Sequence, residues 1–362
     1  MHLKAFRFPV FAFLVLLSAL PAVAQPLSAF VNMQRQFQVW DRGLLRNADF
    51  LPPVEYKIGR IALPFLDNTR AFKIYYGGGV QKINDGFTNQ FFATDNLVAY
   101  LNSKSLNVFD RGTIKNLTTL TDRYFIGDSV VLFQDGIRQE YKIYYDGQVF
   151  PAENFLAQDA IPTAQVSDNI VAYVNFANQF RIFYGGELLK QEDYAVQSFG
   201  VGRNNVAYID ANRRFRAFHA GKTFTLAEYA PQSYTVGDDL VAFVTNDGYF
   251  KIFYDDSVRT IGFFQPEYRV GDHVVAYKDA GGYLRVFYKG ELYTLDTYFP
   301  EKMSLSYNSL VYVSQTNTLR MFYDGEIYDV SSGSDEWQLQ YDVLRYATVP
   351  NVYRVFWKGE DY

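Results

Sequence analysis

A short apolar motif recurs ten times along the chain at nearly constant spacing. Each copy is a run of about five residues, such as FRIFY or LRVFY, followed by a tight turn. The turns lie at residues 43, 78, 112, 147, 186, 221, 256, 290, 325 and 359, so nine intervals of 34 to 39 residues average about 35. This regularity indicates a tandem-repeat fold in which every unit is built alike and packs on its neighbours, without separately built domains.

Each repeat has the pattern of β-strands. Apolar residues alternate with a period of two, and turn residues punctuate the sequence every five to eight positions, so about four short strands follow one another. In one repeat we expect strands over 268–270, 274–277, 284–288 and 292–295. Glycine occupies the second position of the tight turn in nine of the ten repeats, as a hairpin with positive φ requires, and Asp256 is the exception. No helical period occurs after residue 24.

The strand before each tight turn is apolar on both faces. Leu284, Val286 and Tyr288 share one face, while Arg285 and Phe287 share the other. A sheet of this kind must be covered on both sides, as happens when small sheets stack radially as blades around an axis. One aromatic position recurs in every repeat and is expected in the core: Trp40, Tyr75, Phe109, Tyr144, Phe183, Phe218, Phe253, Phe287, Phe322 and Phe356.

This combination of strands and turns resembles the β-propeller repeat proteins as a class, without the signatures of WD-type or kelch repeats. The resemblance covers residues 26 to 362 and implies an all-β fold of tandem four-stranded repeats. The first repeat lacks the strand that should precede residues 29–31, and the last stops at residues 359–362, before an outer strand. Ten units could close as one propeller-like ring, form two smaller propellers of about five blades, or remain an open β-repeat stack.

Residues 1–24 are typical of a cleaved signal peptide. Lys4 and Arg7 precede an apolar run at 8–20, and small residues at 21–24 form a cleavage site. We expect residues 25–362 to form a single tandem-repeat β domain, without membrane insertion after cleavage because no other segment is as apolar. Export without any cysteine favours a bacterial periplasmic or extracellular location.

Composition excludes several functions. A formal net charge of −5 argues against nucleic-acid binding, and the lack of cysteine removes disulfides, thiolate metal sites and a thiol nucleophile. His219 and His273 lie 54 residues apart in different repeats, and no Gly-x-Ser-x-Gly motif accompanies either, which disfavours both a zinc site and a serine hydrolase. Gly77–Gly79 lacks the features of a phosphate loop. We therefore predict no catalytic residue, no cofactor and no metal.

Departures from the repeat mark the candidate binding residues. His219, Asp41 and Asp110 stand where most repeats have tyrosine, and Asp255–Asp256 form the tight turn that lacks glycine. Trp337 is a loop aromatic of the kind that stacks on sugar rings. The simplest interpretation of His219 is a strand residue that replaces tyrosine.

A second repeating feature is a basic residue two positions before the core aromatic in eight repeats: Lys73, Lys142, Arg181, Arg216, Lys251, Arg285, Arg320 and Arg354. In a ring these side chains could bind an acidic glycan. We favour structural ion pairs, because buried charges need partners. The expected partners are acids of the Gly-Asp turns: Asp95, Asp128, Asp168, Asp238, Asp272 and Asp342.

These observations predict an exported, non-catalytic binding or scaffolding module of the bacterial envelope or exterior, whose ligand is an unidentified protein or glycan. The alternative is a polysaccharide-active hydrolase or lyase that uses a pair of carboxylates on the same scaffold. A third interpretation is a purely structural protein of the cell surface, which would have no pocket.

Overall fold

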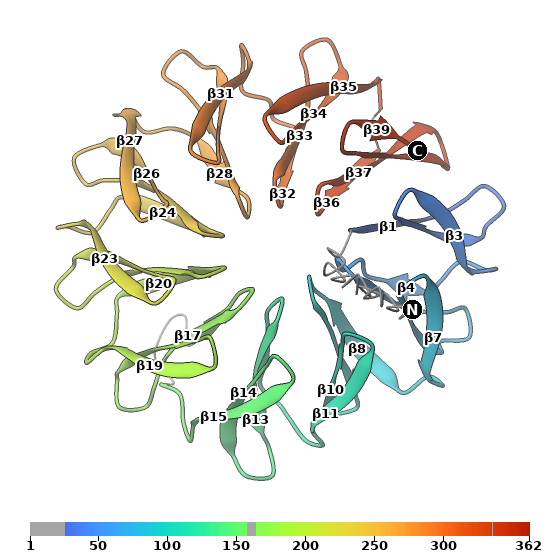
Figure 1. The fold of residues 1–362 in the computed structure, drawn as a ribbon, viewed down its shortest axis with the longest axis horizontal. Coiled ribbons are helices and arrows are strands. Elements are labelled where there is room, and N and C mark those ends of the chain that lie inside the picture. The colour runs from blue at the N-terminus through green and yellow to red at the C-terminus, as the bar shows by residue number, and fades with distance from the viewer. Residues whose placement is uncertain (1–25, 158–163, 335) are drawn as a thin grey trace, which may run out of the picture.

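Ten small antiparallel sheets follow one another along the chain and surround a central axis. The computed structural model describes residues 26–157, 164–334 and 336–362, and the predicted signal peptide lies outside these ranges. Within the described residues every regular element is a strand, and each sheet is a meander of consecutive strands. Figure 1 shows the sheets as blades of one ring. The all-β, propeller prediction is therefore confirmed as a single ten-bladed β-propeller.

Each complete blade has four strands, which we call A to D from the axis to the rim (Figure 1). The inner A strands are β4 (Glu55–Tyr56), β8 (Thr88–Ala93), β12 (Tyr124–Ile126), β16 (Ala164–Val166), β20 (Ser198–Gly202), β24 (Ser233–Gly237), β28 (Tyr268–Val270), β32 (Met303–Ser306) and β36 (Trp337–Gln340). The B strands are β1 (Leu27–Val31), β5 (Ala62–Leu66), β9 (Leu97–Asn102), β13 (Val130–Asp135), β17 (Ile170–Val174), β21 (Asn205–Ile209), β25 (Leu240–Val244), β29 (Val274–Lys278), β33 (Ser309–Val313) and β37 (Val343–Val349).

The two outer layers complete the blades. The C strands are β2 (Phe37–Asp41), β6 (Phe72–Tyr76), β10 (Ser105–Asp110), β14 (Glu140–Tyr145), β18 (Phe180–Tyr184), β22 (Phe215–His219), β26 (Tyr249–Tyr254), β30 (Leu284–Tyr288), β34 (Thr318–Tyr323) and β38 (Val352–Trp357). The outer D strands are β3 (Leu44–Asp49), β7 (Gly79–Asn84), β11 (Thr113–Thr118), β15 (Gln148–Glu153), β19 (Glu187–Glu192), β23 (Lys222–Ala227), β27 (Ser257–Phe263), β31 (Glu291–Asp296), β35 (Glu326–Ser332) and β39 (Glu360–Asp361).

The meander places different turns on the two faces of the ring. Because successive strands run in opposite directions, the A–B and C–D turns of all blades lie on one face, which we call the AB face. The B–C turns and the loops between blades lie on the other face, which we call the BC face. The predicted tight turns are the C–D turns, and their glycines have positive φ, for example +84° at Gly112 and +82° at Gly290.

Both faces of each blade are buried against a neighbour. In the eighth blade, Leu284 and Val286 pack with Phe322 of the ninth blade. Phe287, on the opposite face of the same strand, packs with Ile252 of the seventh blade. This two-sided burial explains why the C strands lack the polar alternation of a sheet that faces water.

A ladder of aromatic edge-to-face contacts links successive blades. The last residue of strand C lies nearly perpendicular to the core aromatic of the next blade, with ring centroids 5.3 to 5.8 Å apart. Each such pair contributes about 0.5–1.5 kcal/mol beyond the area it buries. The pairs are Tyr76–Phe109, Tyr145–Phe183, Tyr184–Phe218, His219–Phe253, Tyr254–Phe287, Tyr288–Phe322 and Trp357–Trp40.

The last pair of this ladder closes the ring. Trp357 belongs to the final blade and Trp40 to the first, and their rings are 5.5 Å apart at 68°. Trp40 is fully buried in a cluster that also contains Phe30 and Val343. The chain ends therefore meet by side-chain packing, because neither sheet borrows a strand from the other. The open stack and the two smaller propellers are both excluded.

The terminal blades differ from the rest. In the described part of the chain, which starts at residue 26, the first blade consists of β1, β2 and β3 without an A strand. The last blade does have a fourth strand, β39 of two residues, where the sequence pattern suggested none. The inner layer thus has nine strands for ten blades within the described ranges. Gln340, the last residue of β36, donates its side-chain amide to the backbone oxygen of Ile58 in the second blade.

The repeating basic residues form ion pairs, but not with the predicted acids. The second residue of strand C lies toward the BC face, whereas the Gly-Asp turns lie on the AB face, so the two sets are too far apart. Several basic residues bond instead to acids at the end of the preceding D strand, such as Arg216 Nη1 to Glu192 Oε1 at 2.6 Å. Ion pairs form at seven of the eight positions: Lys73, Lys142, Arg181, Arg216, Arg285, Arg320 and Arg354.

Truncating Trp40 should test the closure of the ring. We expect Trp40→Ala to lower the free energy of unfolding by about 3–5 kcal/mol, because it removes a fully buried ring from the junction of the first and last blades. Urea denaturation followed by circular dichroism measures this change. Met33→Ala, at a side chain that is 72% exposed, is the control and should change stability by less than about 0.5 kcal/mol. Equal effects of the two substitutions would contradict closure through Trp40.

Candidate binding site on the AB face

The A–B turns form a continuous belt around the axis. Neighbouring turns are hydrogen-bonded to one another, as in Ser129 N to Asp168 O at 2.8 Å and Arg203 N to Asp238 Oδ1 at 2.7 Å. One position of the turn is equivalent in all nine blades that have an A strand. Its residues are Arg60, Asp95, Asp128, Asp168, Arg203, Asp238, Asp272, Tyr307 and Tyr341.

Long side chains at this position reach other blades over the inner ring. The guanidinium of Arg60 lies 4.7 Å from the centre of the Tyr307 ring. These residues belong to the second and ninth blades, so the contact joins two turns that are not neighbours in the ring. A cation over an aromatic face is attracted by the ring's quadrupole, and the contact draws the two turns together.

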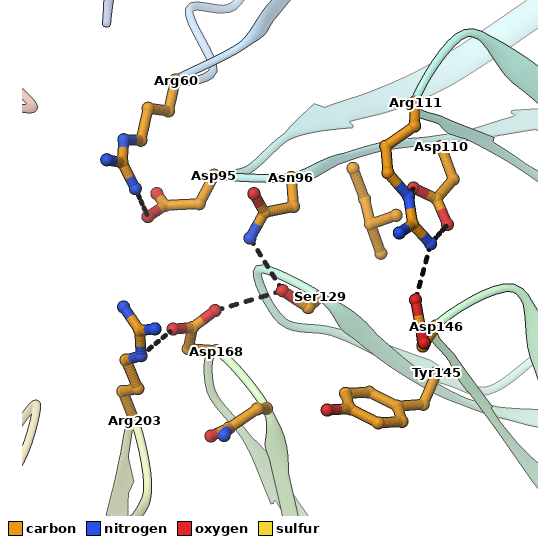
Figure 2. A pocket seen from close by; sticks show the side chains of 12 residues that line it. Arg60, Asp95, Asn96, Asp110, Arg111, Ser129, Tyr145, Asp146, Asp168 and Arg203 are labelled. Carbon is orange, nitrogen blue, oxygen red and sulfur yellow. Dashed lines mark hydrogen bonds and ion pairs between the residues drawn. The ribbon is translucent and has the colours of Figure 1, made fainter. Parts of the chain in front are cut away.

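A hollow of about 360 Å³ lies on the AB face beside this belt (Figure 2). A–B turns of the second to sixth blades line its inner side, and C–D turns of the third and fourth blades line its outer side. Three arginines, Arg60, Arg111 and Arg203, face four aspartates across it: Asp95, Asp110, Asp146 and Asp168. Tyr145 is the aromatic residue among the lining side chains.

The charges in this hollow are paired with one another. Arg203 Nε lies 3.0 Å from Asp168 Oδ2, and Arg60 Nη1 lies 3.9 Å from Asp95 Oδ2. Arg111 bridges two blades, with Asp110 Oδ1 at 3.0 Å and Asp146 Oδ1 at 2.7 Å (Figure 2). These contacts fix both the cationic and the anionic groups, so the site presents an ordered set of donors and acceptors of both signs.

Burial of the belt acids changes their protonation. Burial, and then the charge of Asp128, raises the pKa of Asp95, while burial raises the pKa of Asp128 despite a hydrogen bond from Asp95 N. Burial also raises the pKa of Asp238 to about 7, with further contributions from Asp272 and Asp168. Carboxyls held close together in a desolvated place resist simultaneous ionisation.

Two of the predicted site residues, Asp41 and Asp110, each form a buried hydrogen bond with a tyrosine of the next blade. Asp41 Oδ2 accepts a hydrogen bond from the Tyr75 hydroxyl at 2.8 Å, and Asp110 Oδ2 accepts one from Tyr144 at 2.7 Å. In both cases the aspartate replaces the tyrosine of the aromatic ladder, and the next blade has tyrosine at the core position where most others have phenylalanine. The two departures compensate each other, because a buried phenol needs an acceptor.

His219 and Asp256 are brought together at the junction of the sixth and seventh blades. His219 Nδ1 lies 2.7 Å from Asp256 Oδ1, and its Nε2 lies 3.2 Å from Asp239 Oδ1. The hydrogen bond with Asp239 and then that with Asp256 raise the pKa of His219 above its ordinary value. Asp255 and Asp256 both have positive φ, +51° and +55°, so the C–D turn keeps its shape without glycine.

The six predicted residues do not form one site. Asp110 lines the hollow on the AB face. His219 and Asp256 contact each other at the junction of the sixth and seventh blades, and Asp41 is buried in the core, where it bonds to Tyr75. Trp337 lies half-buried on β36 against a core cluster, away from the AB-face turns. In the part of the chain that the structure describes, no group of three His, Cys, Asp or Glu side chains is arranged to hold a metal.

The sequence analysis missed the arginines of the hollow. Arg60 and Arg203 occupy the turn position that holds aspartate in five other blades, so the signal was present as a break in the repeat. Arg111 carried no such signal, since several repeats have a basic residue at that point of the turn.

The belt acids should make stability pH-dependent. The pKa values of Asp95, Asp128 and Asp238 are raised in the folded protein, so the contribution of these three carboxyls to stability is complete below the ordinary value near 3.8 and is lost as the pH rises through about 6 to 8. We expect the melting temperature to fall between about pH 5 and pH 8 and to fall less in Asp95→Asn, which removes one of the repelling charges. Asp193→Asn, in an exposed loop, is the control. An unchanged slope in Asp95→Asn would refute this assignment.

The titration of His219 tests the cluster at the sixth and seventh blades. Nuclear magnetic resonance of the imidazole Cε1–H should give a pKa above 6.5. Asp256→Asn should lower this value without restoring the ordinary one, because Asp239 remains bonded. Asp255→Asn alters a turn residue whose side chain makes no hydrogen bond to His219 and should leave the titration unchanged. A wild-type value at or below 6.5 would contradict the geometry.

The comparison with protein families agrees with the observed architecture. Residues 21–362 match the model of the 10-bladed beta propeller domain. No curated protein matches the chain. Similar solved structures include the computationally designed Ika8 protein (14% identity, TM-score 0.33, covering 75% of this chain and 96% of that one) and Kluyveromyces lactis Hsv2p (13%, 0.31, 68% and 97%). Another is the CRINKLY WD40 ectodomain of the Arabidopsis thaliana receptor kinase ACR4 (12%, 0.33, 65% and 94%). The match over nearly the whole chain shows that it belongs to the ten-bladed β-propeller domain family.

Proposed function

We propose that this protein is an exported, non-catalytic binding module of the bacterial envelope or exterior, and that it binds a protein or glycan ligand over the central hollow of the AB face. The observation that carries this proposal is the set of fixed, opposite charges that Arg111, Arg203 and their aspartate partners place in the hollow. Such groups are already ordered before binding, which reduces the entropic cost of recognising a polar ligand.

The scaffold supports recognition in a second way. Neighbouring A–B turns are hydrogen-bonded to one another, as in Asp238 N to Asp272 O at 2.5 Å, and Arg111 joins the C–D turns of the third and fourth blades through Asp146. Binding residues that sit on short turns of a rigid scaffold keep their relative positions. The chemistry of the AB face therefore depends on which side chains the turns carry.

The enzymatic alternative has less support. A polysaccharide hydrolase or lyase would use a carboxylate pair at the floor of an aromatic-lined pocket. The hollow has one aromatic lining residue, Tyr145, and its acids are bonded to arginines. Asp95, whose pKa is raised, is the carboxyl best suited to act as an acid, so its variant belongs in any activity assay.

Export rests on the leader pattern of residues 1–24 and on the absence of cysteine. In the described residues, no helix is both long and apolar enough to span a bilayer.

Screening the purified protein against an array of bacterial glycans and peptidoglycan fragments, together with purified envelope proteins, tests the proposal. The double variant Arg111→Gln/Arg203→Gln should weaken the binding found by about 10-fold or more, because each arginine supplies charge-assisted hydrogen bonds. Arg138→Gln, an exposed residue on the BC face, is the matched control and should bind as the wild type does. Binding that survives the double variant, or turnover of a polysaccharide that Asp95→Asn abolishes, would overturn it.

A further inference from the structure

The first blade leaves one strand edge without a neighbour. Among the residues that the structure describes, β1 is hydrogen-bonded to β2 on one side only, whereas the equivalent B strand of every other blade lies between two strands. An edge of this kind offers backbone donors and acceptors to another extended chain.

Arg345 breaks the repeat beside this edge. It is the third residue of β37, and the equivalent positions of the other blades carry small or apolar residues: Ala29, Pro64, Ala99, Leu132, Ala172, Ala207, Ala242, Ala276 and Val311. At those positions the next blade's inner strand crowds the side chain. No inner strand of the first blade occurs among the described residues, so none of them crowds the side chain of Arg345 in this way. Arg345 Nη1 donates to the backbone oxygen of Ala29 at 2.7 Å.

The guanidinium of Arg345 has further hydrogen-bonding capacity. Its Nε is buried and has no acceptor. The contacts of its Nη1 among the described residues are with Ala29 O and, at 3.5 Å, with the Tyr56 hydroxyl, and neither partner is a carboxylate. The ring of Tyr353 lies 4.8 Å from the guanidinium carbon and orients the group. A desolvated arginine with unused donors is suited to a carboxylate, because two parallel N–H groups match its two oxygens.

A hollow of about 580 Å³ surrounds this arginine at the seam of the last, first and second blades. Arg35 and Arg345 line it, and Glu336 is the acid among the lining residues. The Glu336 carboxylate already accepts the Tyr353 hydroxyl at 2.6 Å. The hollow is thus positively charged, and its free donors complement an acidic group.

We propose that this seam binds an extended acidic peptide segment of a partner protein, which pairs with the free edge of β1 and places a carboxylate on Arg345. Addition of a strand to an exposed edge supplies affinity through the backbone, and side-chain contacts supply selectivity. B–C turns and the loop before β4 line the hollow, so it opens toward the BC face and is separate from the AB-face site.

Selection from a phage library of random nonapeptides on the purified protein tests this proposal. We expect the enriched peptides to be rich in β-branched residues with an acidic residue, and a synthetic copy to bind in solution. Arg345→Met, which keeps the aliphatic stem, should weaken that peptide roughly 10- to 100-fold, and Arg345→Lys should fall between Arg345→Met and wild type. Methylation of alternate backbone nitrogens in the peptide should abolish binding, since it removes the strand's donors.

The controls separate the seam from the AB face and from loss of folding. Arg269→Met removes a comparable bond, from Arg269 Nη1 to Met303 O at 3.2 Å between the eighth and ninth blades, and should bind the peptide as wild type does. The double variant Arg111→Gln/Arg203→Gln, which alters the AB-face hollow, should also bind the peptide as wild type does. A negative result at either site therefore leaves the proposal for the other site testable. Circular dichroism melting must show each variant folded. The proposal is overturned if no peptide is enriched, if Arg345→Met binds equally, or if self-association of the chain occupies the seam.

Discussion

The edge-to-face contact between the end of one C strand and the core aromatic of the next blade organises the molecule. A blade of three or four short strands exposes two apolar faces, and only its neighbours can cover both. Each contact contributes little by itself, but the same geometry recurs around the ring, from Tyr76–Phe109 to Trp357–Trp40. The Trp357–Trp40 contact is the one made between the two ends of the chain, so it completes a ring whose other junctions are made by adjacent repeats.

The ring explains where the chemistry lies. Because the C strands pack against neighbouring blades on both faces, the polar groups that differ between repeats lie mainly at the turns and at the seam of the last, first and second blades. The A–B turns are forced together near the axis, which places five aspartates, two arginines and two tyrosines at equivalent positions of one belt. Their mutual hydrogen bonds hold the turns, while burial raises the pKa of several acids. The belt therefore combines structural bonding with an ordered polar surface.

Departures from the repeat have different explanations once neighbouring blades are compared. Asp41 and Asp110 are paired with the phenols of Tyr75 and Tyr144, so these departures compensate each other within the core. Arg345 has no such compensation, because one of its nitrogens remains without an acceptor. A polar residue that breaks a repeat indicates a binding site most clearly where its hydrogen bonds are incomplete.

Local sequence patterns determined the strands, the tight turns and the burial of the core aromatics, because alternation and positive φ are properties of a few adjacent residues. The repeat also indicated stacked blades and correctly favoured ion pairs for the basic C-strand residues. Their partners were assigned wrongly, since Arg216 bonds to Glu192 of the neighbouring blade and the Gly-Asp turns lie on the opposite face. Ring closure, the meeting of Arg60 with Tyr307 and the free edge beside Arg345 were decided only by the tertiary structure. They depend on how ten successive packing angles add up around an axis, and no single repeat contains that sum.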